Sequence, residues 1–391
     1  MALAAAIVLG LCTAGMTWGA SSVSAGPLTK DTAGSRSSAD DNDDDDDAEK
    51  STTTTKPAVP TTKPATTPPP APTTQPPVVT DPPAPSAPAA PQTTATHAPE
   101  PLVPVVGQEI AKTTESLVVS PKVTPGDTSK VGGSSSAGWQ VACPTSHSSN
   151  DDPIVFFGRA GASHQHSFMG SKTTNASSTT AKLLAGDTTC TNKDDKSPYW
   201  VPTLFNNGTA VHPTHGEKGP TGVSSRQTMY YRNPTGKKLH AFPAGLRMIS
   251  GNPAAKSLKE NPQVGRNIWW GCSDNSISQK LTAPPAKCPR GMITVHIHFP
   301  NCWDGVNLDS ANHQSHVAFS SGGSCPASHP VIIPRLTIRN EYIVGTTTGK
   351  ITLSSGDVNT IHADFWNAWN QPALEKLVAN CFNAGKNCGK L

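Results

Sequence analysis

From Trp139 to the C-terminus the sequence consists of short apolar runs separated by Gly, Pro, Asn and Ser, and a helical period is scarce. Many short strands at such spacing are typical of a β-sandwich or jelly roll. We therefore predict that residues 138–391 form a single, mainly β domain. Its strands are expected at Trp139–Ala142, Ile154–Phe157, Tyr199–Phe205, Thr228–Arg232, Leu246–Ile249, Asn267–Gly271, Met292–Phe299, His316–Phe319, Leu336–Ile338 and Tyr342–Val344.

The C-terminal segment is the exception to this pattern. Apolar side chains recur there on one helical face, at Leu374, Leu377, Val378 and Cys381. Pro372 suits the first turn of a helix, Asn370 is a candidate N-cap and Gly385 is a suitable stop. We predict a C-terminal helix that packs on the sheet.

Composition separates this domain from the residues that precede it. The 38 prolines are concentrated before residue 126, whereas every tryptophan except Trp18 lies after residue 138. Residues 26–137 also contain an acidic run, Asp40–Asp47, followed by Thr- and Pro-rich repeats. Such a segment cannot bury enough apolar surface to offset its ordering entropy, and like charges stay solvated. We predict a disordered stalk over residues 26–137; a calcium-binding role for the acidic run is the alternative.

Residues 1–25 have the features of a secretory signal peptide. Leu3–Leu11 form an apolar region, and Val23-Ser24-Ala25 provides a cleavage site of small residues before Gly26. An uncleaved anchor is less favoured because the apolar run is short and interrupted by polar residues. We therefore predict a secreted, extracellular protein with no membrane span after cleavage. A stalk of this kind also suits a cell-wall location.

Eight cysteines remain outside the signal peptide, and an even number in a secreted chain indicates disulfides. Their spacing does not fix the connectivity. We expect sequential pairing, in which neighbours along the chain are joined: Cys143–Cys190, Cys272–Cys288, Cys302–Cys325 and Cys381–Cys388.

Several function classes are disfavoured. The net charge of +3 is small and does not form a basic stripe, so no nucleic-acid partner is expected. The GxSxG, GxGxxG and Walker motifs are absent from the sequence. Glycoside hydrolysis usually needs two facing carboxylates. The folded part is poor in Glu, so such a pair would have to be built from aspartates.

One stretch is unusually rich in side chains that can do chemistry. His296–His316 contains four histidines, two aspartates, one cysteine and one tryptophan in 21 residues. It is too polar for an ordinary core strand and too rich in functional groups for an ordinary linker. We predict that the working site lies close to it.

This stretch also carries a family resemblance. Its segment Phe299–Ser310 (FPNCWDGVNLDS) occurs with Gly161–His166 (GASHQH), Asp195–Pro202 (DKSPYWVP), Trp269–Cys272 (WWGC) and His362–Phe365 (HADF) in a consistent order. Over residues 150–385 the chain resembles the DUF1996 family, a domain of unknown function in secreted proteins of fungi and actinobacteria. Because members sometimes occur beside carbohydrate-binding modules, the resemblance implies a polysaccharide-rich setting; it implies no particular activity.

Three short pairs are candidates for a metal or acid–base centre. In an extended backbone, residues i and i+2 point to the same side. Neutral imidazole is both a metal ligand and a proton carrier near neutral pH. For any single pair the alternative is a histidine bonded to backbone at a sheet margin. The pairs are His164/His166, His296/His298 and His362/Asp364.

The pairs differ in what surrounds them. His296 and His298 alternate with an apolar face, so we expect them to border the site only. The other two pairs come from distant parts of the chain. We predict that they converge and hold a divalent metal or act as an acid–base centre, with the candidate ligands His164, His166, His362 and Asp364.

The central stretch also suggests a sugar site. Trp303 precedes Asp304, and an aromatic ring beside a carboxylate is typical of a sugar-binding cleft. Other aromatic residues could extend the platform, although about half of adjacent strand aromatics belong to the core. For Asn307 and Asp309 the alternatives are turn capping or a calcium loop.

Two functions remain open. The first is a carbohydrate-active enzyme on extracellular polysaccharide, with His164, His166, Asp304, His316, His362 and Asp364 as catalytic residues and Trp303, Asn307, Asp309, His313, Trp200 and Tyr231 as substrate contacts. The second is a non-catalytic polysaccharide- or wall-binding module that uses Trp303 and its aromatic neighbours. Convergence of His164, His166, His316 and His362 in an open cleft would favour the enzyme.

Overall fold

The computed structural model describes residues 123, 126, 128–132, 137–277 and 279–391. The predicted signal peptide and almost all of the predicted stalk lie outside these residues. Within them, no helix is both long and apolar enough to cross a membrane.

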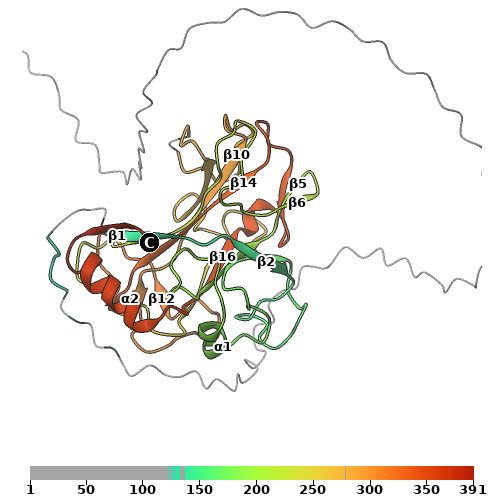
Figure 1. Cartoon of the computed structure of the whole chain (residues 1–391). Helices are drawn as coiled ribbons and strands as arrows, with labels where there is room; N and C mark the ends of the chain where they lie inside the picture. Colours follow the sequence, from blue (N-terminus) through green and yellow to red (C-terminus); the bar gives the residue numbers. More distant parts are fainter. Residues whose placement is uncertain (1–122, 124–125, 127, 133–136, 278) are drawn as a thin grey trace, which may run out of the picture. The chain divides into compact units, whose positions relative to one another are not determined.

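The larger sheet has six strands in the order β17-β1-β7-β14-β10-β9, antiparallel except for the β1/β17 pair. On β10 the apolar residues Ile293, Val295 and Ile297 alternate with polar ones, so one face is apolar. Figure 1 shows β10 and β14 running side by side. The strands are β1 (Gly138–Ala142), β7 (Gln227–Arg232), β9 (Ile268–Cys272), β10 (Met292–His298), β14 (Arg335–Ile343) and β17 (Asn387–Lys390).

The second sheet has five antiparallel strands in the order β2-β3-β4-β16-β8. Four of its strands are buried on both faces, whereas β2, at one edge of the sheet, is partly exposed. They are β2 (Thr145–Ser149), β3 (His166–Gly170), β4 (Pro198–Pro202), β8 (Arg247–Gly251) and β16 (His362–Trp366).

The inner faces of the two sheets share one apolar core. Tyr199 of β4 and Tyr231 of β7 meet there, with their hydroxyls 2.6 Å apart. Asp195 accepts a hydrogen bond from Tyr199 at 2.6 Å, so the buried phenol has a polar partner. The predicted mainly β, disulfide-bonded fold is thus confirmed, as two sheets packed face to face.

The outer face of the five-stranded sheet carries a second, smaller apolar cluster. Its members include Phe168, Trp200 and Trp366, one from each central strand. Ile154 and Leu183, from the segment between β2 and β4, cover them. A functional site on this face is therefore partly enclosed by a loop.

The remaining elements are short. Two three-stranded sheets have the orders β12-β11-β13 and β15-β5-β6. Their strands are β5 (Leu204–Asn206), β6 (Thr209–Val211), β11 (Cys302–Trp303), β12 (Val317–Ala318), β13 (Val331–Ile332) and β15 (Ile351–Leu353). The helices are α1 (Thr180–Ala185), the 3₁₀ turn η1 (Val358–Thr360), α2 (Gln371–Leu377) and the π-helical turn η2 (Val378–Phe382).

The C-terminal helix forms where the sequence predicts it. The Asn370 side chain accepts from the Ala373 amide at 3.2 Å and caps α2. Leu374, Val378 and Cys381 are buried on one face. All four predicted disulfides are also present, at Cys143–Cys190, Cys272–Cys288, Cys302–Cys325 and Cys381–Cys388.

Four of the predicted strands need correction. Ile154–Phe157 is a turn, because Asp152 accepts hydrogen bonds from the Ile154 and Val155 amides and curls the chain. The run Tyr199–Phe205 divides into β4 and β5. Leu336–Ile338 and Tyr342–Val344 are largely parts of a single strand, β14.

Candidate functional site

Strand register brings two distant histidines to one face. In β3 and β16 alternate residues point outward, and these include His166 and His362. Trp200 of β4 is paired with both Phe168 and Asp364. The same register, continued for two residues, places Pro202 between His166 and His362. Both histidines therefore lie in one row across the outer face of the five-stranded sheet.

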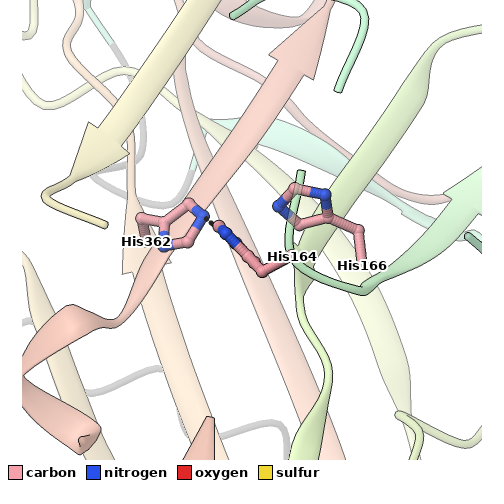
Figure 2. A group of neighbouring side chains, drawn as sticks. All are labelled: His164, His166 and His362. Carbon is pink, nitrogen blue, oxygen red and sulfur yellow. Dashed lines mark hydrogen bonds between the residues drawn. The ribbon is translucent and has the colours of Figure 1, made fainter. Parts of the chain in front are cut away.

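His164, just before β3, completes a cluster of three histidines, called here the histidine cluster. Figure 2 shows its ring lying between those of His166 and His362. The ring centroid of His164 lies 4.3 Å from that of His166 and 5.1 Å from that of His362. One ligand nitrogen from each ring lies within 4.8 Å of the other two. Nitrogens bound to one zinc ion lie at most about 4.2 Å apart, so a shift of less than about 1 Å would allow one ion to contact all three.

Hydrogen bonds to the backbone determine which ring nitrogens face inward. His166 Nδ1 lies 2.9 Å from the Asp151 carbonyl oxygen, and His362 Nδ1 lies 2.8 Å from that of Thr360. A carbonyl oxygen can only accept, so each Nδ1 carries the proton and each Nε2 presents a lone pair. Metal-binding histidines are oriented in this way. His164 Nε2 lies 3.3 Å from His362 Nε2.

The cluster is neutral at pH 7. Burial lowers the pKa of His166 to about 3 and that of His362 to about 4, and the neighbouring His362 further lowers the pKa of His166. Burial also lowers the pKa of His164, with both neighbouring histidines adding to the effect. Neutral imidazole is the form that binds a metal. His164 is half-buried, so the cluster has contact with solvent at this residue.

Asp364 lies beside the cluster, with Oδ2 at 3.9 Å from His362 Nε2. Its side chain is buried, and within the described part of the chain neither carboxylate oxygen has a hydrogen-bond partner. Burial raises the pKa of Asp364 well above its usual range, and the nearby Asp152 adds to this effect. A buried carboxyl without partners is costly and requires an explanation such as an ion. The same holds for His166 Nε2, which is also buried without a partner among the described residues.

A second polar group lies on the same sheet face. Asp309 is 2.9 Å from His313 Nδ1 and 3.6 Å from Arg247 Nη1. The Arg247 guanidinium lies over the Trp366 ring, 3.9 Å from its centroid. Asp152 interacts electrostatically with Asp309 and His313, and also with Asp364. Asp152 therefore lies between this group and Asp364, the neighbour of the histidine cluster.

Some of the residues on this sheet face are predicted from the sequence, and others are not. The predicted convergence of His164, His166, His362 and Asp364 agrees with the structure. Arg247 and Asp152 are absent from the predicted site. For Arg247 the signal is its position two residues before Ile249, on the outward side of a strand. For Asp152 the sequence has no comparable signal.

Two predicted catalytic residues, Asp304 and His316, form hydrogen bonds with their own loop and its neighbour. Asp304 Oδ1 accepts from the Val306 and Asn307 amides, and Oδ2 accepts from the Asn307 side chain. His316 is buried and forms hydrogen bonds with the Arg247 carbonyl at 2.6 Å and with Ser310 Oγ at 3.0 Å. Both side chains stabilise the loop that carries Asp309.

The predicted sugar platform does not agree with the burial of its rings. Trp200 and Tyr231 are fully buried, and Trp303 is nearly so, with its indole nitrogen donating to the Asn307 carbonyl. A ring in the core has no free face for a sugar. His296 and His298 point away from the core of the six-stranded sheet and pack on Trp269. They are on the other sheet and do not border the histidine cluster.

The fold and the site define a disulfide-bonded β-sandwich protein with three histidines and an aspartate on one outer sheet face. The chain belongs to the DUF1996 family, because the family model described as "Domain of unknown function (DUF1996)" matches its residues 152–369. The matched range contains all the residues of the histidine cluster and of the Asp309 group. Searches of the curated proteins and of the solved structures found no match.

Proposed function

We propose that this domain is an extracellular, carbohydrate-active enzyme with a divalent metal bound by the histidine cluster. The observation that carries the proposal is the convergence of three imidazole rings, two of which have Nδ1 fixed by a backbone carbonyl. Asp364 is a candidate fourth ligand, because its buried oxygens face His362 without a partner among the described residues.

The chemistry follows from this ligand set. Three histidines that leave a coordination position open are typical of catalytic zinc, and with Asp364 as a fourth ligand an open position would require a five-coordinate site. Imidazole also suits copper, iron and nickel. A divalent metal lowers the pKa of a bound water to near neutral, which supplies a nucleophile for hydrolysis. Half-buried His164 would lie on the side from which substrate approaches.

The location and substrate class have separate support. Four disulfides suit an extracellular protein. The polysaccharide substrate follows from the family resemblance of the sequence and from the predicted wall-directed stalk. The non-catalytic binding module is less favoured, because Trp303 and Tyr231, which it would use, are buried.

Metal analysis of the purified full-length chain tests the metal. After reconstitution with Zn²⁺ and desalting, the wild type should retain about one equivalent, whereas His164→Ala and His362→Ala should bind it at least about 10- to 100-fold more weakly. His215→Ala, a change of an exposed histidine outside the cluster, is the control. Retention of zinc by both cluster variants, or none by the wild type, would exclude this centre.

Activity is tested on a panel of wall polysaccharides, with release of soluble products measured by mass spectrometry. The metal-loaded wild type should release products that the chelated protein and His164→Ala do not release. If the wild type binds metal but releases nothing from any glycan, the carbohydrate-active part of the proposal is wrong.

A further inference from the structure

We infer that His313 is the proton-transferring residue of this site and that the bond hydrolysed is an acyl ester carried by the polysaccharide. This inference rests on the proposed metal centre. It goes beyond that centre by naming a residue, a bond and a step.

The pairing of His313 with Asp309 fixes the state of the imidazole. His313 Nδ1 lies 2.9 and 3.1 Å from the two carboxylate oxygens of Asp309. The carboxylate accepts, so Nδ1 carries a proton and Nε2, on the far side of the ring, is the nitrogen that exchanges one. The His313 side chain is 14% exposed, against 5% for Asp309. A buried carboxylate that orients a partly accessible imidazole is the arrangement of a general base in acyl transfer.

The loop around this pair is held rigidly. His316 joins the loop to β8 through the Arg247 carbonyl and bonds Ser310 within the loop. Arg247 Nη1 lies 3.6 Å from Asp309 Oδ2, so the carboxylate has a second partner besides His313. His313 itself has a φ of 57°, in the left-handed region that residues other than glycine rarely adopt. Backbone strain of this kind is typical of functional positions.

The His313–Asp309 pair and the histidine cluster share one sheet face. Strand β16 presents His362, Asp364 and Trp366 outward in succession. The cluster lies at the His362 end, whereas Arg247, which holds Asp309, packs on Trp366 at the other end. Asp152 interacts electrostatically with His313 and Asp309 and with Asp364, the neighbour of the cluster. Every residue of β16 is buried, so a substrate that meets both groups would lie over the residues that cover this strand, with half-buried His164 at one end and partly exposed His313 at the other.

The carboxylates near the cluster disfavour glycosidic cleavage. That reaction needs two carboxyl groups that flank the bond. Asp152 and Asp364 are only 4% and 1% exposed, and Asp152 already accepts from two amides. Neither can flank a sugar ring. A phosphate ester would require a cationic clamp, and Arg247 is paired with Asp309 instead. Hydrolysis of an ester with an uncharged acyl group needs neither two flanking carboxyl groups nor a cationic clamp.

The reaction is balanced with water alone. Water loses a proton to His313 Nε2 and its oxygen bonds to the acyl carbon. The bond between that carbon and the sugar oxygen then breaks. His313 returns the proton to the departing sugar oxygen, so an ester and a water become a carboxylic acid and a sugar hydroxyl.

Two substrates with different leaving groups test this step on the full-length chain loaded with zinc. On acetylated xylan the leaving alkoxide must be protonated, so His313→Gln should lower acetate release by about 10²- to 10⁴-fold. On 4-nitrophenyl acetate the leaving group departs without a proton and only the deprotonation of water is lost, so the loss of rate should be at least about tenfold smaller than on acetylated xylan. Zinc content should stay at the wild-type level, and His215→Gln, the control, should behave as wild type on both substrates.

Three outcomes would overturn the inference. Equal losses on the two substrates would show that His313 does not protonate the leaving group. Unchanged acetate release by His313→Gln would remove the residue from the reaction. If zinc-loaded wild type releases no acetate, the acyl-ester assignment is wrong while the metal centre stands; a wild type that binds no zinc is instead a failure of the proposed centre.

Discussion

Two buried aspartates of this fold differ in their hydrogen-bond partners. Asp195 accepts from the Tyr199 hydroxyl at 2.6 Å and from the Ser197 amide at 3.1 Å. Asp364 has no such partner among the described residues. Burial raises the pKa of Asp195 to about 7 and that of Asp364 well above its usual range. Asp195 stabilises the fold through its hydrogen bonds. Asp364 destabilises the metal-free domain, and the proposed metal site gives a reason for its presence.

This contrast makes a prediction about Asp364→Ala. Removal of an unpartnered buried carboxyl should raise the free energy of unfolding of the metal-free domain by about 1–3 kcal/mol. Asp195→Ala should lower it by a similar amount, since it leaves the buried Tyr199 hydroxyl short of a partner. Urea titrations of both variants and the wild type, after chelation, measure these changes. A destabilised Asp364→Ala protein would show that the carboxyl has a structural partner.

At the scale of elements, the Asp152 side chain is the reason that residues 154–157 form a turn and not a strand. Ile154–Phe157 consists of β-branched and aromatic residues, which predicts a strand, yet Asp152 accepts hydrogen bonds from the Ile154 and Val155 amides that a strand would use. Position 152 precedes the apolar run, and its effect depends on burial that a local pattern does not reveal. The helix α2 was predictable because its cap and its apolar face are both local in sequence.

The disulfides make a ranked prediction at this scale. Cys143–Cys190 joins residues 47 apart, whereas Cys381–Cys388 joins residues 7 apart. Because a longer closed loop restricts the unfolded chain more, removal of the first should cost about 4 kcal/mol and removal of the second about 2.5 kcal/mol. Thermal or urea unfolding of the two double Cys→Ala variants measures the costs. The reverse order would mean that loop entropy is not what these bridges contribute.

For the whole molecule, sequence spacing predicts pairs of side chains, and topology decides which pairs meet. The alternation of His164/His166 and of His362/Asp364 is visible in the sequence. Their meeting depends on β4 lying between β3 and β16, which no local pattern encodes. His296 and His298 have the same spacing but belong to the other sheet. The aromatic residues were misassigned because adjacent rings on a strand face both the core and the outer side, and here both sides are covered.

The histidines of the six-stranded sheet make the molecule sensitive to acid. Burial lowers the pKa of His296 to about 3, and the nearby Arg339 and Lys280 add to this effect. Burial likewise places the pKa of His298 well below its usual value. In the unfolded chain both titrate near about 6.5. Between that pH and about 3 the unfolded state therefore binds more protons, and stability falls as the pH falls.

Buried carboxyls act in the opposite direction in part of this window. Burial raises the pKa of Asp152 to about 6 and that of Asp195 to about 7, so these groups favour the folded state more as the pH falls. The wild-type slope is a sum of the two effects, and a difference between variants isolates the histidines. The double variant His296→Gln/His298→Gln should lose less stability between pH 7 and pH 4 than the wild type. The slope of its unfolding free energy against pH should correspond to the uptake of up to about two fewer protons on unfolding. Urea midpoints at several pH values measure this, with His329→Gln as the control. Parallel pH profiles for the double variant and the wild type would mean that both histidines titrate alike in the folded and unfolded states.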